Sequence, residues 1–536
     1  MPPTSRNPGK KGRRASTKPR PAIVRPVVSA SVLQLDLVDE PLLEFGGGHV
    51  AIDPKEGIAD SGPYTVGLQG RHPESLTLGL VGTDASIQGV SAWLDRCRQK
   101  VAAAAGQELL HPAFPGFSRA SPFQSEVILR EEWNERLTAR EMDKLLELPG
   151  SAQRFQFAVD LVADKIEHLA NRDTPPRVVA LALPDQIIQL CWSVDAGALE
   201  AQRQRLSPIE RRMLRRRREE ERYGQGSLFG KLEPEIKRHL AYRNFRRAVK
   251  ARAMRHNVPI QLLQAHSWAL GEGVGRQPRC TVAWNLFTAL YYKAGGFPWV
   301  LEALNPGECF VGVSFHRSVS DPSRGMYSSL AQVFSNRSEG LVLRGDRFEW
   351  DEKALGRAPH LKYEDAAALV RRVVQTYERE HQHKPSRLVI HKTSVYWEDE
   401  LRGFKDGLEN ISDYDFVSVT QQGTRLFREG QYPPLRGTHA CIAQRFHVLY
   451  TMGFIPALRG YPRGYVPDPL VVTDHHGQSS PERICAELMA LSKMNWNSAD
   501  FAATEPITLK FAKRVGEIMT ELPEGEEPKP LFKFYM

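Results

Sequence analysis

The sequence has few cysteines and no long apolar run. Its six cysteines, spread over 536 residues, include no pair at the Cys-x-x-Cys spacing of zinc and redox sites. We therefore expect reduced core cysteines in a cytoplasmic protein, without a disulfide framework or a zinc centre. No apolar run reaches the ~18 residues that a membrane span needs. The basic N-terminus also lacks the apolar core of a secretory signal.

Acidic residues are absent from two segments that are rich in lysine and arginine. Residues 1–26 carry eight of these cations and no acid, which accounts for nearly all of the net charge of +9. This Pro-, Gly- and Ser-rich tail (1–28) predicts disorder. It either adds non-specific affinity for nucleic acid or acts as a solubilising leader. Residues 237–271 hold eight further cations and again no Asp or Glu.

The second acid-free segment predicts a helix with cations on one face. Four of them follow the i, i+3, i+4, i+7 spacing of a helical face: Arg243, Arg246, Arg247 and Lys250. Like charges along such a stripe repel one another unless an anion lies among them. We interpret that anion as a phosphate of a nucleic acid. The alternative is a surface helix with solvated cations, which the lack of acids disfavours because exposed helices normally mix both signs.

A charged segment at about 203–233 precedes this stretch. Its core, RRMLRRRREEERY, places three glutamates after a run of arginines, so that opposite charges can pair at helical spacing. We expect a solvated insertion here, and a phosphate-binding segment is the alternative.

Strands and helices alternate in the first half of the chain. Three apolar segments are typical of buried strands: 76–81, 124–130 and 178–183. Two longer segments have helical spacing: 87–105 and 151–171. Residues 29–36 alternate like a further strand, and the glycine-rich segment 42–64 predicts a loop or hairpin, not a helix. This order predicts a Rossmann-like α/β domain with a parallel sheet.

The second half begins with three strands in succession. Five strands are expected in all: 309–315, 328–334, 340–344, 387–392 and 414–420. Helices are expected at 363–380 and 398–408 among them, and at 481–494 and 508–521 near the end. Three strands, helix, strand, helix and strand is the order of a ribonuclease-H-like fold. We therefore expect an α/β chain with a Rossmann-like domain followed by a ribonuclease-H-like domain.

Five motifs resemble, in order, the PIWI part of prokaryotic Argonautes. They are YKAGG with PWVL, FVGVSF, AQVF with GLVLRG, LVIHKTS, and LMALSKMNWN with PITLKFAKRVG. The segment LEFGGGHVAIDPKEGIADSGPY resembles the entry segment of short Argonautes, which have only MID and PIWI domains. The resemblance covers nearly everything from about Leu42 onward. It implies an entry segment and a MID domain within 29–300, and a PIWI domain at 301–536.

The MID domain of that family binds the 5′-phosphate of a guide strand. The residues that match the family pattern for this site are Arg246, Lys250, Gln261 and Lys293. Arg243 and Arg247 are additional candidates for nucleic-acid contact. The family commonly adds Mg²⁺, shared by the guide phosphate and the C-terminal carboxylate, which would here be that of Met536.

Guided cleavage by a PIWI domain requires carboxylates that hold two Mg²⁺ ions. The resemblance places the metal-binding acids of an active domain at positions that are occupied here by Ser314, Thr393 and Lys513. Hydroxyl groups lack the negative charge for this task, and a lysine repels the metal. We therefore expect a domain that binds a duplex without cutting it, and so no enzyme. The segment Asp474–His476 suggests another metal site, but we expect a polar turn there.

The resemblance also implies a function. Short, inactive Argonautes load a small guide, expected to be RNA, and recognise complementary single-stranded DNA. They then activate a partner protein in which an APAZ region is joined to a TIR, SIR2 or nuclease domain, in defence against plasmids or phages. This chain has no glycine-rich dinucleotide fingerprint and no expected NAD site. Two alternatives are an active guide-directed endonuclease and a sequence-nonspecific nucleic-acid binder.

Overall fold

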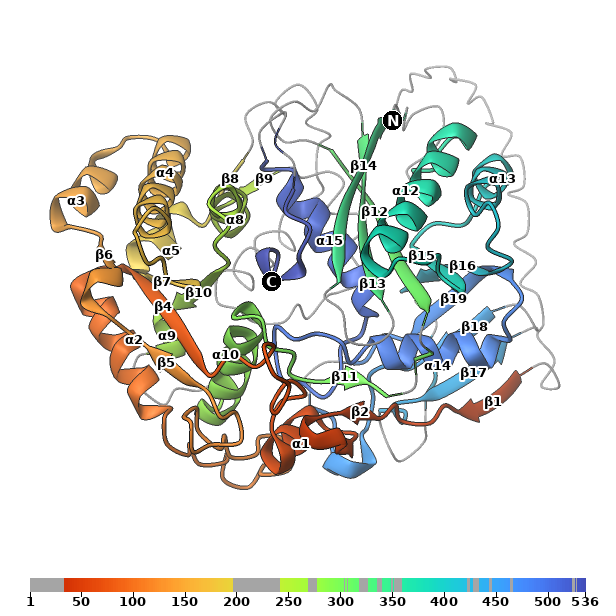
Figure 1. Cartoon of the computed structure of the whole chain (residues 1–536), viewed down its shortest axis with the longest axis horizontal. Helices are drawn as coiled ribbons and strands as arrows, with labels where there is room; N and C mark the ends of the chain where they lie inside the picture. The colour runs from red at the N-terminus through yellow and green to blue at the C-terminus, as the bar shows by residue number, and fades with distance from the viewer. Residues whose placement is uncertain are drawn as a thin grey trace, which may run out of the picture.

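The chain forms two α/β halves, each built on its own large sheet (Figure 1). The computed structural model describes residues 33–195, 242–268 and 277–536, the last range with gaps at 303, 306, 318–325, 335–339, 349, 351–358, 422–424, 428–432, 443–445, 463–465, 523–525 and 527. The basic tail (1–28) and the charged insertion (203–233) of the sequence analysis lie outside the described residues. No described helix is long and apolar enough to cross a membrane.

The first half is built on a parallel sheet with the strand order β10-β7-β4-β5, with β6 also paired to β4. Its strands are β4 (Ser75–Gly82), β5 (Glu126–Ile128), β6 (Asn134–Arg136), β7 (Val178–Leu183) and β10 (Ile260–Gln264). Its helices are α2 (Asp84–Arg96), α3 (Ala139–Glu147), α4 (Ser151–Ala170), α5 (Asp185–Cys191), α8 (Phe245–Arg255), α9 (Ala265–Trp268) and α10 (Arg279–Lys293), and a hairpin of β8 (Ser193–Asp195) and β9 (Tyr242–Asn244) precedes α8. All of β7 is buried, as in parallel strands that are covered on both faces. The Rossmann-like prediction is confirmed, although α2 ends well before residue 105.

The second half is built on a sheet with the order β1-β17-β18-β19-β16-β15-β12-β13-β14. Its strands are β1 (Leu33–Leu37), β12 (Glu308–Arg317), β13 (Met326–Phe334), β14 (Leu341–Phe348), β15 (Arg387–Lys392), β16 (Asp413–Thr420), β17 (Thr438–Ile442), β18 (Phe446–Leu449) and β19 (Leu470–Gly477). Helices α12 (Tyr363–His381) and α13 (Glu398–Gly407) pack on one face, and α14 (Pro481–Leu491) and α15 (Ile507–Met519) pack on the other. β12 runs antiparallel to β13 and parallel to β15, and β15 runs parallel to β16. The ribonuclease-H-like prediction is confirmed.

Helix α15 lies directly on strand β12. A Cβ atom added at Gly312 would come within 2.1 Å of the Thr508 carbonyl oxygen, so only glycine permits this approach. Oγ1 of Thr508 also lies 2.9 Å from Nδ1 of His391 on β15. Because side chains alternate along a strand, Ser314 points to the same face as Gly312, the face that α15 covers.

The glycine-rich segment 42–64 contains a helix that the sequence analysis did not predict. It begins as a hairpin of β2 (Leu43–Glu44) and β3 (Val50–Ala51) and continues as α1 (Pro54–Ser61), whereas β11 (Val300–Leu301) pairs with β2. Oδ1 of Asp53 accepts a hydrogen bond from the Lys55 amide at 2.8 Å. The Asp-Pro pair is therefore a helix cap followed by proline in the first turn, and not a turn between strands.

Two further expectations need correction or qualification. The segment Asp474–His476 lies inside β19, which continues to Gly477, so the expected turn is wrong. Strand β1 pairs with β17 of the second sheet, although the division near residue 300 assigns it to the first domain. All six cysteines are free and all except Cys441 are fully buried, as expected for reduced core residues.

Candidate nucleic-acid-binding site

Basic side chains converge where α8 of the first half packs against α15 of the second. Arg246 and Lys250 lie one turn apart on α8, and Lys293 is the last residue of α10. The second half adds Arg514 from α15. Lys293 Nζ donates a hydrogen bond to Oε1 of Gln261 on β10. We call Arg246, Lys250, Gln261, Lys293 and Arg514 the cation cluster.

Burial and mutual repulsion lower the pKa values of the two lysines of this cluster, each of which is only 2% exposed. For Lys250 burial has the largest effect on the pKa, and the charges of Lys293, Arg246 and Arg514 add to it. For Lys293 burial is again the largest cause, followed by the two arginines. Burial also lowers the pKa of Arg514. A site that disfavours its own positive charges favours an anion that restores them.

Two groups of the cation cluster have no hydrogen-bond partner among the described residues. They are Nζ of Lys250 and Nη1 of Arg514, and both are buried. A buried and unpaired cation costs free energy that an anion with hydrogen-bond acceptors can recover. A phosphate monoester carries about −1.5 to −2 charges and three acceptor oxygens, so it offers both. The cluster is therefore suited to bind a phosphate through charge-assisted hydrogen bonds.

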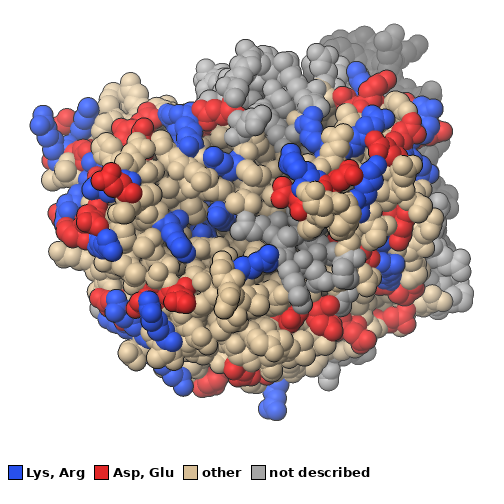
Figure 2. All heavy atoms as spheres, in the orientation of Figure 1, with Lys and Arg blue, Asp and Glu red and all other residues tan. Residues whose placement is uncertain are grey.

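The other two cations of the predicted stripe contact carboxylates of the protein itself. Arg243 lies on β9, before α8 begins, so its expected place on the helix is wrong. Nε of Arg243 lies 3.0 Å from Glu521, and Nη2 of Arg247 lies 3.1 Å from Glu517. The second half thus supplies acids to a segment that has none of its own, and the ion pair of Arg247 with Glu517 joins α8 to α15. Figure 2 shows basic and acidic side chains interspersed over the drawn face of both halves. A role of Arg243 and Arg247 in nucleic-acid contact stays a prediction.

The last residues of the chain pack beside α10. Met536 is 2% exposed and shares a core cluster with Tyr292, and the short helix η8 (Phe532–Phe534) contacts α10. Mg²⁺ takes oxygen ligands, but the cation cluster offers amines, guanidinium groups and one amide oxygen that already accepts from Lys293. Among the described residues, no three His, Cys, Asp or Glu side chains form a group that could hold a metal. The Mg²⁺ that the resemblance implies, shared by the guide phosphate and the C-terminal carboxylate of Met536, stays a prediction.

Three residues are expected to stand where an active PIWI domain has catalytic acids, and they lie on neighbouring elements. Ser314 is on β12, Thr393 directly follows β15, and Lys513 is on α15. β12 and β15 pair in parallel up to the residues that precede Ser314 and Thr393. Nζ of Lys513 forms an ion pair with Glu505. Two hydroxyl groups and a paired lysine offer little to divalent ions, which need several carboxylate oxygens.

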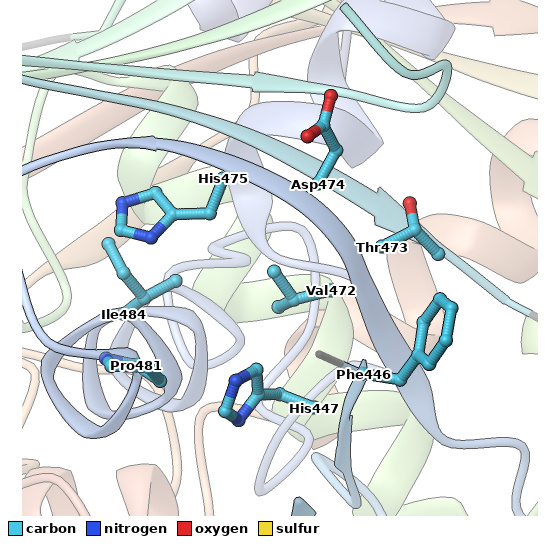
Figure 3. A pocket seen from close by; sticks show the side chains of 8 residues that line it. All are labelled: Phe446, His447, Val472, Thr473, Asp474, His475, Pro481 and Ile484. Atoms are coloured by element: carbon cyan, nitrogen blue, oxygen red, sulfur yellow. The ribbon is translucent and has the colours of Figure 1, made fainter. Parts of the chain in front are cut away.

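A separate cavity of about 380 Å³ lies beside β18, β19 and the start of α14 (Figure 3). The imidazoles of His447 and His475 lie on either side of Val472. Nδ1 of His447 is 3.0 Å from Nε2 of His439, and Nε2 of His475 is 2.7 Å from Asp415. Burial lowers the pKa values of His439 and His447, which favours their neutral forms. None of the residues that line this cavity belongs to the cation cluster.

No protein-family model and no curated protein matches the sequence, but solved structures match the fold. Clostridium butyricum Argonaute, bound to a guide DNA and a 19-mer target DNA, matches 94% of this chain with a TM-score of 0.61 and 12% identity. The chain has an Argonaute-like fold. A. aeolicus Argonaute matches 93% of it with a TM-score of 0.52 and 12% identity. This chain covers 55% of the length of each of the two.

Within the Argonaute-like fold, the cation cluster includes one residue that the sequence analysis missed. Arg514 lies in the motif PITLKFAKRVG, next to Lys513, which was assigned to the catalytic position. Adjacent residues on a helix point roughly 100° apart, so the two side chains leave α15 in different directions. The four residues matched by pattern, Arg246, Lys250, Gln261 and Lys293, do come together.

Proposed function

We propose that this chain is a guide-dependent nucleic-acid sensor that anchors the 5′-phosphate of a small guide in the cation cluster. The observation that carries the proposal is that two cationic nitrogens, Nζ of Lys250 and Nη1 of Arg514, are buried without a hydrogen-bond partner among the described residues. The similarly folded Clostridium butyricum Argonaute is bound to guide and target DNA, which supports the same class of ligand. The resemblance to short Argonautes favours an RNA guide and a complementary single-stranded DNA target.

The chemistry of the proposed site is neutralisation of charge. Phosphate oxygens accept hydrogen bonds from Lys250, Lys293 and Arg514, and Arg246 adds positive charge one turn away from Lys250 on α8. The amide nitrogen of Gln261 is a further donor, since its oxygen is held by Lys293. The guide bases then read the target by pairing, while the protein contributes charge and shape.

A direct test compares guides that differ only at the 5′ end. The full chain should bind a 5′-phosphorylated RNA at least about tenfold more tightly than the same RNA with a 5′-hydroxyl, because a charge-assisted hydrogen bond contributes about 1.5–3 kcal/mol. Equal affinities in a fluorescence titration would reject the proposed site. Nucleic acid that co-purifies with the chain should consist of short strands of uniform length. A random smear would favour the nonspecific binder.

We further propose that the PIWI half does not cut its target, because Ser314, Thr393 and Lys513 stand where an active domain has acids. A chain loaded with guide and mixed with labelled complementary DNA should leave the target intact in Mg²⁺ and in Mn²⁺. Gel electrophoresis measures this outcome, and Ser314→Ala should bind the target as the unmodified chain does. A discrete cut opposite the guide would instead support the active endonuclease.

We also propose that the effector chemistry belongs to a partner protein with an APAZ region, in a heterodimer that acts in defence against plasmids or phages. The support is the resemblance to short Argonautes together with the lack of catalytic acids at the three positions. Co-expression of the two proteins should yield a complex whose TIR, SIR2 or nuclease activity requires both guide and target. An effector that is equally active without guide would overturn this part of the proposal.

Binding of the guide phosphate should take up protons. In the free protein the pKa values of Lys250 and Lys293 lie well below the ordinary value, and a nearby dianion raises them again. The complex therefore holds more protons than the free protein. The affinity for the guide should fall as the pH rises from the lysine pKa values of the free protein to the higher values of the complex. Calorimetry in buffers with different ionisation enthalpies measures this uptake. Proton release on binding would contradict the assignment.

A further inference from the structure

The edge strand β1 carries an exposed row of leucines. β1 is the terminal strand of its sheet, and among the described strands it pairs only with β17. Leu33 is 44% exposed, and Leu35 and Leu37 are each 59% exposed. The two residues between them are also exposed, so no described residue covers either face of this strand. An edge with unpaired backbone groups and apolar side chains is a template for another strand.

The leucine row continues across the neighbouring strands. Leu33 lies opposite Ile442 of β17, which in turn lies opposite Phe446 of β18, itself 45% exposed. Leu35 lies opposite Ala440 in the same way. Directly paired residues share one face of a sheet, so these side chains form one apolar strip from the free edge inward. We call this strip, with β1 as its outer border, the β1 face.

We propose that the β1 face binds a second copy of this chain, with the two β1 strands antiparallel about a two-fold axis at Leu35. The reason is the sequence of the strand, LQLDL, which repeats its apolar and polar pattern when it is reversed. In this pairing Leu35 meets Leu35 of the second copy, Leu33 meets Leu37, and Gln34 meets Asp36. Leucine faces leucine on one side of the joined sheet, and no two carboxylates are directly opposed.

The other registers are less favourable for this strand. A shift by one residue would place each leucine on the polar face of the partner strand. A shift by two residues would leave only part of the strand paired. The two-fold arrangement also uses the same edge of both copies, so it closes at a dimer and does not extend into a filament.

Crosslinking tests the two-fold axis directly. Directly opposed residues have Cβ atoms about 5 Å apart, so full-length Leu35→Cys should give a crosslinked dimer with a short bismaleimide. Leu33→Cys alone should give far less, whereas a mixture of Leu33→Cys and Leu37→Cys should crosslink in trans. The unmodified chain, with its partly buried Cys441, measures the background. Equal crosslinking of Leu33→Cys alone and Leu35→Cys would overturn the proposed register.

Sedimentation tests the interface without new cysteines. Leu35→Asp places two carboxylates together at the axis and should weaken self-association at least about tenfold. Leu109→Asp is the matched control, because Leu109 is 50% exposed but lies outside the β1 face, and it should leave association unchanged. A monomer at all concentrations, or a dimer that Leu35→Asp does not weaken, would reject the proposal. The interface is independent of guide binding, so variants of the cation cluster should still dimerise.

Discussion

Replacement of both Lys250 and Lys293 by methionine should weaken binding of a 5′-phosphorylated guide by about 100- to 10,000-fold. Each lysine offers a charge-assisted hydrogen bond to the phosphate, and such bonds contribute about 1.5–3 kcal/mol each. Affinity for the same guide with a 5′-hydroxyl should change much less, because the rest of the strand does not depend on these amines. A fluorescence titration with both guides measures the difference.

The same double variant should be more stable than the unmodified protein in the absence of guide. Burial and the neighbouring cations disfavour the charged form of both amines. Methionine has no charge to bury, so the free energy of unfolding should rise. Loss of binding combined with a higher melting temperature separates a local change in the site from misfolding. Lys100→Met with Lys405→Met, both at exposed positions, is the control and should alter neither quantity. Unchanged affinity for the phosphorylated guide in the double methionine variant would show that the phosphate binds elsewhere.

Local patterns were sufficient to predict one wall of the cation cluster. Arg246 and Lys250 follow helical spacing, and α8 brings them to one face. Lys293 on α10 contacts Gln261 on β10. This contact was expected only because both residues match the phosphate-site pattern of the Argonaute MID domain. Arg514 was missed because its place depends on how α15 packs over the first half, and no local pattern encodes that packing.

Long-range pairing explains the remaining differences between prediction and structure. β1 was predicted as a strand from its alternation, but nothing nearby in the sequence indicates that its partner is β17. The acid-free stripe suggested that all four cations await an external anion. Arg243 and Arg247 instead have Glu521 and Glu517, which come from the far end of the chain. Charge counts along a segment therefore overstate the free charge of a folded surface.

The largest expected loss of stability follows replacement of Arg387 by methionine. Arg387 is 1% exposed and lies 2.6 Å from both Asp415 and Glu487 and 3.2 Å from Glu308. Removing one partner of a buried ion pair costs about 3–5 kcal/mol, because the remaining charges stay buried. Chemical denaturation of the purified variant measures this loss. Arg425→Met breaks an exposed contact of 2.8 Å with Asp468 and should cost less than about 1 kcal/mol.

The loss caused by Arg387→Met should depend on pH in a defined direction. Burial alone would raise the pKa of Asp415, but hydrogen bonds from His475, Ser479 and Arg387 hold it below its ordinary value. Burial already raises the pKa of Glu487 in the presence of Arg387, and without the guanidinium group the pKa of Asp415 should rise as well. The folded variant then binds more protons than the unfolded chain, so the destabilisation should be greatest at neutral pH and shrink in acid. Adding Asp415→Asn and Glu487→Gln should recover most of the stability at neutral pH. Two of the three carboxylates that Arg387 neutralises are then gone, and Arg483 still pairs with the third, Glu308. A loss that does not change with pH would mean that Arg387 acts through packing alone.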